Sequence, residues 1–153
     1  MLHRIQSEQF LKCSREAAWA FISNPANLAE ITPSYMQFKV LRGAEQIMYP
    51  GQIIEYTVRP LLNIPLHWVT EITHVKDEES FVDEQRFGPY SFWHHQHTLI
   101  DTAGGVKMFD TVHYKLPYGI FGKLADQVAI RHQLAGIFSY RRNKLDTLFN
   151  QDK

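Results

Sequence analysis

Three of the chain's eight histidines fall within four residues, in the stretch FWHHQHTL at positions 92–99. His94, His95 and His97 could hold a metal ion, exchange protons with a substrate, or supply polar atoms to the wall of a pocket. Which of these functions applies depends on which histidines share a face, and therefore on the secondary structure of this stretch.

The histidine stretch has the length and composition of a β-strand, in which alternate residues lie on the same face of a sheet. His95 and His97 then share a face with Trp93 and Leu99, and His94 lies on the opposite face. Since the large apolar side chains must be buried, we expect His95 and His97 to point inward and His94 to point into solvent.

A carboxylate is expected beside the inward histidines. The next strand, over residues 106–117, carries Asp110 on its more apolar face and His113 on the other face, which we expect to be solvated. The short connection at residues 102–105 favours antiparallel pairing and places Asp110 opposite His97 or His95. A carboxylate in that position would orient the imidazole and favour its protonated form.

A metal site is not expected from the sequence pattern. Zinc sites use three or four ligands, and His95, His97 and Asp110 could supply three of them. However, the chain contains no HExxH or CxxC pattern. We therefore predict no metal and no other cofactor.

An enzymatic function would depend on the same residues, because a His97–Asp110 pair in a dry pocket could act as the general base of a cyclase or dehydratase. No nucleophile is indicated, since Ser91 lies in a predicted turn and Cys13 at the end of a predicted strand. A binding function requires fewer special residues. We therefore favour it and assign no catalytic residue.

The composition is that of a globular chain, with 153 residues, 44% hydrophobic residues and 13% aromatic residues. We expect one domain over residues 1–153. Sixteen basic residues balance sixteen acidic ones, so no basic surface for nucleic acid is indicated. The sequence shows no signal-peptide pattern and no run of about 20 apolar residues that could span a membrane. We expect a cytoplasmic protein, and the sequence does not indicate its oligomeric state.

The order of predicted elements is one strand, two short helices, six strands and one long helix. Alternation predicts the first strand over residues 3–13, and capping residues predict short helices over 15–23 and 25–32. Six further strands are predicted over residues 37–43, 51–60, 64–76, 80–87, 91–101 and 106–117. The connections between them are short, which favours a meander of antiparallel neighbours.

The last predicted element is a helix over residues 122–149. Its apolar face is assigned from residues at helical spacing, namely Leu124, Val128, Ala135, Phe138, Leu145 and Phe149. Its basic residues, Arg131, Arg141, Arg142 and Lys144, are expected largely on other faces. This helix is the only predicted element long enough to cover a seven-stranded sheet with one apolar face. The prediction is therefore an α+β fold, a curved seven-stranded antiparallel sheet wrapped around one long helix, with a space between them for an apolar ligand.

Two motifs support this architecture. The first reads Phe81-Val82-Asp83-Glu84-Gln85, then Gly88-Pro89-Tyr90, then Trp93, His95 and His97, and the second reads Asp110, Val112, Tyr114, Leu116, Pro117 and Gly119. On these residues the chain resembles the Bet v 1-like superfamily, also called START/polyketide-cyclase or SRPBCC, and is most similar to its small bacterial ligand-binding-type members. The resemblance implies a helix-grip fold. The superfamily includes lipid carriers, hormone receptors, quinone-binding proteins and a few cyclases.

The predicted function is binding of a hydrophobic small molecule, such as a lipid, a quinone or a polyketide-like compound, in an internal cavity between the sheet and the long helix. The ligand's polar or anionic group would lie beside His95 or His97. The expected ligand-contacting residues are Tyr56, Trp68, Gln85, Trp93, His95, His97, Asp110, Tyr114 and Phe138. For Asp83, a position at the cavity mouth and a role in capping a loop stay open. The alternatives are a cyclase- or dehydratase-like enzyme and a protein-interaction module with a filled pocket. Cavity volume separates the last of these from the other two.

Overall fold

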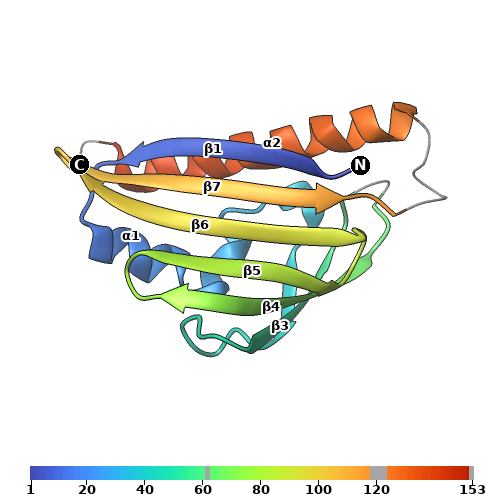
Figure 1. Cartoon of the computed structure of the whole chain (residues 1–153), viewed down its shortest axis with the longest axis horizontal. Helices are drawn as coiled ribbons and strands as arrows, with labels where there is room; N and C mark the ends of the chain where they lie inside the picture. The colour runs from blue at the N-terminus through green and yellow to red at the C-terminus, as the bar shows by residue number, and fades with distance from the viewer. Residues whose placement is uncertain (61–62, 118–123, 152–153) are drawn as a thin grey trace.

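The computed structural model describes residues 1–60, 63–117 and 124–151 and shows one seven-stranded antiparallel sheet with one long helix (Figure 1). The strands lie in the order β1-β7-β6-β5-β4-β3-β2. Their bounds are β1 His3–Leu11, β2 Lys39–Arg42, β3 Gln52–Val58, β4 Leu66–Lys76, β5 Ser80–Phe87, β6 Phe92–Thr102 and β7 Gly105–Lys115. The predicted α+β helix-grip architecture is thereby confirmed.

The first short helix, α1 (Arg15–Ile22), begins as predicted, because the Ser14 hydroxyl accepts a hydrogen bond from the Ala17 N–H at 3.2 Å. The second predicted helix is shorter and tighter, a 3-10 helix η1 (Pro25–Ala29) capped by Asn24, and a further 3-10 turn, η2 (Ser34–Met36), follows it. Short 3-10 segments let the chain fold back over the sheet without a long helix.

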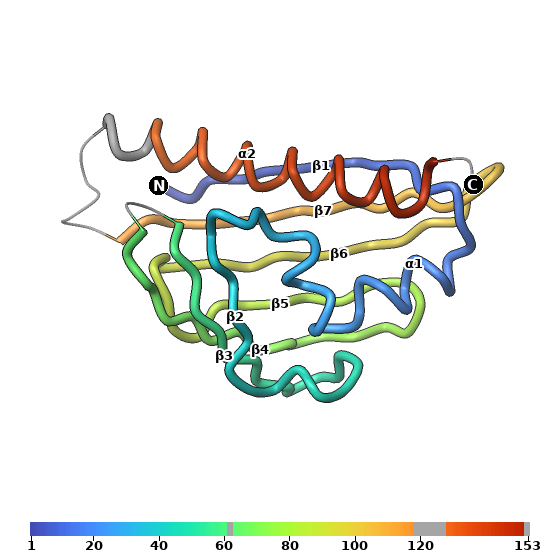
Figure 2. Tube along the Cα trace, turned by 180° about the vertical axis from the view of Figure 1, so that it is seen from behind, coloured from blue at the N-terminus to red at the C-terminus, as the bar shows by residue number. Residues whose placement is uncertain are grey.

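The long helix α2 (Leu124–Phe149) runs along the β1 and β7 half of the sheet, as Figure 2 shows from behind. The segment between α1 and β2 lies in front of the β5 and β6 half in the same view. Gln133 on α2 donates a hydrogen bond to the Pro60 carbonyl near the end of β3, which joins the two sides. The predicted first residues of the helix, 122 and 123, lie outside the described part of the chain.

The buried face of α2 differs from the predicted one. Ile130, Leu134 and Leu145 are buried, whereas Val128 and Ala135, predicted to face the sheet, are exposed. The prediction was wrong because α2 carries apolar residues on more than one face, and Val128 and Ala135 were chosen in place of Ile130 and Leu134. The true stripe repeats every three or four residues and includes Arg141, whose side chain is only 12% exposed. Of the other predicted positions, Phe138, Leu145 and Phe149 do pack inward, and the side chain of Leu124 lies outside the described residues.

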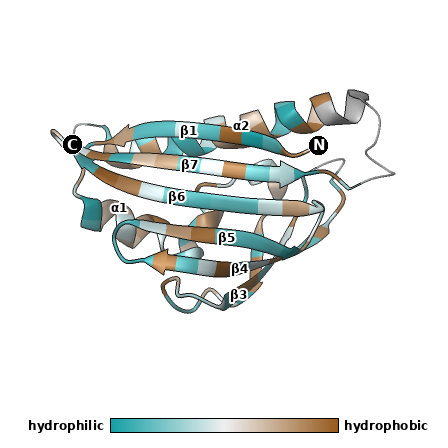
Figure 3. Cartoon of the chain, viewed as in Figure 1, coloured by the Kyte–Doolittle hydropathy of each residue, from teal (hydrophilic) through white to brown (hydrophobic). Residues whose placement is uncertain are grey.

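Alternation along the strands is visible in Figure 3, where hydropathy changes from residue to residue. The core of buried apolar side chains lies between the concave face of the sheet, α1, η1 and α2. At the β6–β7 connection, Gly104 has a φ of 80° and completes a two-residue turn between the paired residues Thr102 and Gly105. This turn fixes the register of β6 against β7.

Among the helices in the described residues, none combines the length and the apolar character needed to cross a membrane. This agrees with the absence of an apolar run of that length in the sequence.

The contact of α2 with the core can be tested by shortening one side chain. Leu145 is 0% exposed, so replacement by alanine leaves a cavity, and we expect Leu145→Ala to lower the free energy of unfolding by about 2–5 kcal/mol. Leu148 on the same helix is 37% exposed, and Leu148→Ala should change stability by less than about 1 kcal/mol. Urea denaturation of both variants checks this, and equal effects would contradict the described orientation of α2.

Candidate functional site

Five polar side chains gather on the concave face of the sheet. Asp83 lies on β5, His95 and His97 on β6, Asp110 on β7, and Arg141 reaches them from α2. His95, His97 and Asp110 are 5%, 3% and 3% exposed. The predicted inward orientation of both histidines and of Asp110 is therefore confirmed. We call these five residues the polar cluster.

The strand register brings the polar cluster together. The β6–β7 turn pairs His97 directly with Asp110, which is one of the two pairings expected from the sequence. On the other side of β6, Asp83 is paired directly with His95. His97 is also a diagonal neighbour of Asp83, and His95 is a diagonal neighbour of Asp110, so their side chains can reach each other. The two rings therefore lie between two carboxylates.

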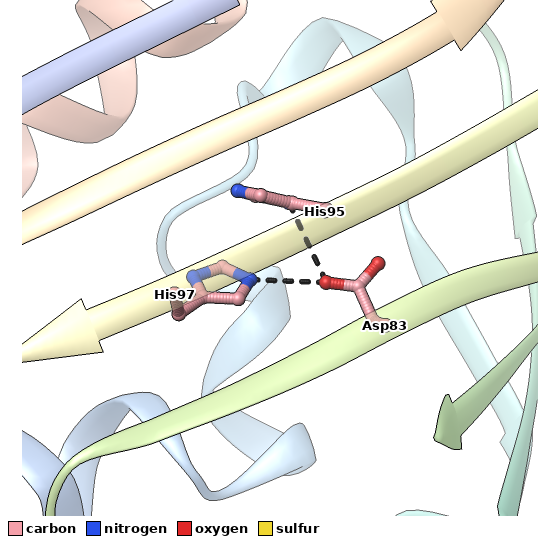
Figure 4. Close-up of side chains that lie close together, drawn as sticks. All are labelled: Asp83, His95 and His97. Atoms are coloured by element: carbon pink, nitrogen blue, oxygen red, sulfur yellow. Dashed lines mark hydrogen bonds and ion pairs between the residues drawn. The ribbon is translucent and has the colours of Figure 1, made fainter. Parts of the chain in front are cut away.

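Four nitrogen–oxygen contacts join the histidines to the aspartates. His97 Nε2 is 3.0 Å from Asp83 Oδ2, and His95 Nδ1 is 3.4 Å from the same oxygen (Figure 4). On the far side, His97 Nδ1 is 2.8 Å and His95 Nε2 is 3.1 Å from Asp110 Oδ1. The Nη2 of Arg141 lies 3.7 Å from that oxygen of Asp110 and 3.3 Å from His97 Nδ1.

The surroundings shift the pKa values of all four titratable groups. Burial alone would raise the pKa of each carboxyl, but nearby positive charge outweighs it. For Asp110, Arg141 and the two histidines hold the pKa well below its usual value. For Asp83, the pKa is lowered by His95, His97 and Arg141. Both carboxyls are therefore anionic near neutral pH.

The two imidazoles respond in opposite directions. Burial favours neutral rings, and together with the neighbouring charge of His97 it lowers the pKa of His95. His97 is also buried, but its hydrogen bonds to Asp110 and Asp83 outweigh burial and raise its pKa. With His97 protonated and Arg141 charged, two positive charges balance the two carboxylates.

A cavity of about 180 Å³ lies against the polar cluster. Its walls come from β3, β4, β5, β6, α2 and the segment between α1 and β2, and most of the lining is apolar. Seven aromatic side chains form part of the wall, namely Phe38, Tyr56, Trp68, Phe81, Tyr90, Trp93 and Phe138. Asp83, His95, His97 and Arg141 also line it, so the polar cluster forms one charged patch in an apolar enclosure.

Two of the aromatic residues already have hydrogen-bond partners. The Tyr56 hydroxyl lies 3.0 Å from Thr70 Oγ1, and the Trp68 indole N–H donates to that same oxygen at 3.1 Å. Thr70, two residues from Trp68 on the same strand face, therefore satisfies both groups within the protein. Tyr56 and Trp68 therefore offer ring surface to the cavity.

Three of the predicted ligand-contacting residues do not line the cavity. The Gln85 amide bonds instead to the backbone of Tyr90, donating to the carbonyl at 2.6 Å and accepting from the N–H at 3.2 Å. Tyr114 is buried beneath α2, where it packs with Ile130 and Leu134. Asp110 lies behind the two imidazoles. The remaining six predicted residues, Tyr56, Trp68, Trp93, His95, His97 and Phe138, do line the cavity.

Tyr90, Asp83 and Arg141 are among the cavity residues that were not predicted as ligand contacts. Tyr90 is held in the wall by the hydrogen bonds of Gln85 to its backbone, and only the turn residues Gly88-Pro89 indicated a loop there. Asp83 shares a strand face with Phe81, which was a usable signal for an inward position. Arg141 lies four residues before the buried Leu145, a spacing that could have indicated the inner face of α2.

The outer-face histidines are less exposed than predicted. His94 and His113 do lie on the face opposite to His95, but both are half-buried and their ring centroids are 6.2 Å apart. The Nδ1 atom of His94 is buried and has no hydrogen-bond partner among the described residues. The predicted outward face is therefore observed, and the two rings, paired across β6 and β7, partly cover each other there.

Solved structures with the same fold are numerous. The aromatase/cyclase Zhui from Streptomyces sp. R1128 superposes with a TM-score of 0.75 at 10% identity, over 95% of this chain and 92% of that one. Protein CV1439 from Chromobacterium violaceum gives a TM-score of 0.74 at 14% identity, over 97% and 99% of the two chains. Ara h 8.0201 gives a TM-score of 0.61 at 13% identity, over 96% and 99%.

No protein-family model matches the sequence, and no curated protein matches it by sequence. The structural likenesses therefore concern the fold. They confirm the Bet v 1-like helix-grip fold expected from the two motifs.

The dependence of the polar cluster on Asp110 can be measured as stability. Without this carboxylate, two imidazole nitrogens and Arg141 lose their buried acceptor, and we expect Asp110→Ala to lower the free energy of unfolding by about 3–5 kcal/mol. The Glu8–Lys107 pair on the neighbouring strands is exposed, so Glu8→Ala should cost less than about 1 kcal/mol. Denaturant unfolding compares the two, and a loss below about 1 kcal/mol for Asp110→Ala would contradict the described cluster.

Proposed function

We propose that the protein binds an apolar, ring-containing small molecule that carries a hydrogen-bond-accepting oxygen. One observation supports this most directly. The cavity wall is largely aromatic and aliphatic, yet it contains the cation Arg141, whose buried Nε has no hydrogen-bond partner among the described residues. An unpaired buried donor carries a free-energy cost, which an acceptor on a ligand would relieve.

The size of the cavity argues against a filled pocket. A dry engineered cavity of about 150 Å³ lined by apolar side chains takes up benzene, and the cavity here measures about 180 Å³. It therefore admits at least one aromatic ring without displacement of the wall. This disfavours the alternative of a protein-interaction module whose pocket is filled by side chains.

The charges around the cavity favour a neutral oxygen over a free anion. Even with His97 protonated, Asp83 and Asp110 balance the charges of His97 and Arg141, so the polar cluster has no excess positive charge. A carboxylate entering beside Asp83 would be repelled. A ketone, quinone or phenol oxygen can accept from Arg141 without this repulsion.

An acid–base enzyme is a second candidate, because His97 lines the cavity while hydrogen-bonded to a carboxylate. A protonated imidazole in that position can give a proton to a substrate oxygen and later recover it. Asp110, which lies behind the rings, would act through His97 as a positioning residue. The superposition with an aromatase/cyclase agrees with this candidate at the level of the fold.

Tryptophan fluorescence tests ligand binding. Trp68 and Trp93 line the cavity and Trp19 does not, so a ring ketone or quinone should quench wild-type emission saturably. We expect quenching to persist in Trp19→Phe and to fall in Trp93→Phe. The titrations are made with a chelator present, so that any bound metal ion is removed and only binding of the organic ligand is measured. Absence of saturable quenching across a panel of lipids, quinones and aromatic polyketide analogues would contradict a binding cavity.

The same titration tests the contact with Arg141. A hydrogen bond to a charged donor contributes about 1.5–3 kcal/mol, so Arg141→Met should weaken binding of an aromatic ketone roughly 10- to 100-fold. The corresponding hydrocarbon, which lacks the oxygen, serves as the internal control and should bind wild type and variant alike. Equal loss for both compounds would show that Arg141 only maintains the shape of the cavity.

The enzyme candidate makes a separate prediction, because turnover needs a proton that binding does not. With a cyclisable or dehydratable aromatic substrate, Asp110→Asn should reduce kcat more than it changes KM, since the substrate does not touch Asp110. Product formation followed by mass spectrometry is the measurement. Turnover that is unchanged in Asp110→Asn and His97→Gln would remove these residues from any reaction.

A further inference from the structure

We propose that Asp83, His95 and His97 form a binding site for a divalent first-row transition-metal ion, oriented by Asp110 and open to the cavity. The site consists of two imidazole nitrogens and one carboxylate oxygen from the neighbouring strands β5 and β6. It differs from the ligand set considered in the sequence analysis, in which Asp110 was the third ligand. This inference does not rest on the proposed ligand-binding function.

The three ligand atoms have separations suited to a common metal ion. Bonds of about 2.0–2.2 Å place neighbouring ligand atoms about 2.8–3.6 Å apart, depending on the coordination number. Asp83 Oδ2 lies 3.0 Å from His97 Nε2 and 3.4 Å from His95 Nδ1, and all three atoms lie within 4.8 Å of one another. In Figure 4, dashed lines join both rings to the same carboxylate oxygen.

The protonation of His95 gives a second argument. His95 Nε2 is hydrogen-bonded to Asp110 and His97 Nε2 to Asp83, whereas His95 Nδ1 only approaches Asp83 Oδ2 to 3.4 Å. Two charged rings are disfavoured, because their centroids are only 3.8 Å apart in a buried position. With a neutral His95 protonated at Nε2, the lone pair of Nδ1 faces the Asp83 carboxylate, and a cation between them would remove this repulsion.

Asp110 has the position of an orienting carboxylate. Metal-bound histidines usually donate their second ring N–H to a carboxylate, a carbonyl or water, which fixes the tautomer. Here the far nitrogens of both rings, His97 Nδ1 and His95 Nε2, lie 2.8 and 3.1 Å from one oxygen of Asp110. Protons on these far nitrogens would leave the lone pairs of the nitrogens that face Asp83 available to bind a cation.

The ligand set indicates the class of metal and its accessibility. Two nitrogens and one carboxylate suit Zn²⁺, Fe²⁺, Co²⁺ or Ni²⁺, whereas Ca²⁺ and Mg²⁺ prefer oxygen ligands throughout. Asp83, His95 and His97 all line the cavity, so the remaining coordination positions face the space proposed for the ligand. With a divalent ion, neutral rings, two carboxylates and Arg141, the cluster carries one net positive charge and would accept an oxygen ligand.

Binding of Zn²⁺ and Co²⁺ to protein first stripped with a chelator tests the proposal. We expect one ion per chain with micromolar or tighter affinity, and a visible Co²⁺ absorption band characteristic of nitrogen and oxygen ligands. Asp110→Asn should weaken Zn²⁺ binding about 10- to 100-fold, as loss of an orienting group does. Asp83→Asn and His97→Gln should weaken it further. Far-UV circular dichroism and metal-free melting confirm that each variant is folded.

Matched controls separate this site from other positions. Glu84→Gln changes the carboxylate next to Asp83, and His94→Ala removes one ring of the outer-face pair with His113. Neither should change the tight binding. Zn²⁺ should raise the melting temperature of wild type and of both controls, but not that of Asp83→Asn.

Three results would overturn the proposal. They are no binding at millimolar Zn²⁺ or Co²⁺, equal affinity in wild type and in folded Asp83→Asn, and loss of binding in His94→Ala alone. Each leaves the proposed ligand binding intact, because that is measured with a chelator present. Conversely, failure of the fluorescence titrations leaves the metal measurements unaffected.

Discussion

The interaction on which the structure depends is the neutralisation of two carboxylates on the concave face of the sheet. Asp83 and Asp110 lie on strands separated only by β6, among side chains such as Phe81 and Val112 that are otherwise apolar. A buried carboxylate without a partner is strongly destabilising. The two histidines of β6 must therefore face inward, where His95 is hydrogen-bonded to Asp110 on one side and His97 to Asp83 on the other.

This requirement also positions the long helix. Arg141 reaches the polar cluster only if its face of α2 turns toward β7, and that orientation buries Ile130, Leu134 and Leu145 on the same side. Charge pairing and apolar packing thus select one rotation of α2 about its axis. The helix lies over the β1 and β7 half of the sheet, and the other half is covered by short 3-10 segments. The cavity lies between these two covers.

Much of the fold could be predicted from local pattern because strands and turns are encoded by near neighbours in the sequence. Alternation in β6 and the short connection at residues 102–105 limit the partner of Asp110 to His97 or His95, and the two-residue turn at Ala103-Gly104 selects His97. The contact of Asp83 with the two histidines could not be predicted in the same way. Alternation shows which face of the sheet a residue lies on, but it does not show which partner its side chain reaches. Gln85 shares that face, yet its amide bonds to the backbone of Tyr90.

The contribution of α2 was the least predictable from pattern. In the sequence, a charged residue within an apolar stripe indicates that the stripe is interrupted. Burial of such a residue is favourable only when a residue on a distant strand supplies an opposite charge. Arg141 is brought to Asp110 by tertiary packing, 31 positions along the chain. The exposure of Val128 and Ala135 has the same origin, since the rotation that admits Arg141 turns these residues outward.

The chemistry proposed for the cavity is limited by a single atom, His97 Nε2. An acid–base function needs a proton on this nitrogen, which now contacts Asp83 at 3.0 Å. A bound metal ion needs the lone pair of the same nitrogen, so the two functions exclude each other there. Binding of an apolar ligand is compatible with either, because the rings of Tyr56, Trp68 and Trp93 form their surface independently of that nitrogen. The occupant of the space between Asp83 and the two histidines therefore decides whether acid–base chemistry at His97 is open to this cavity.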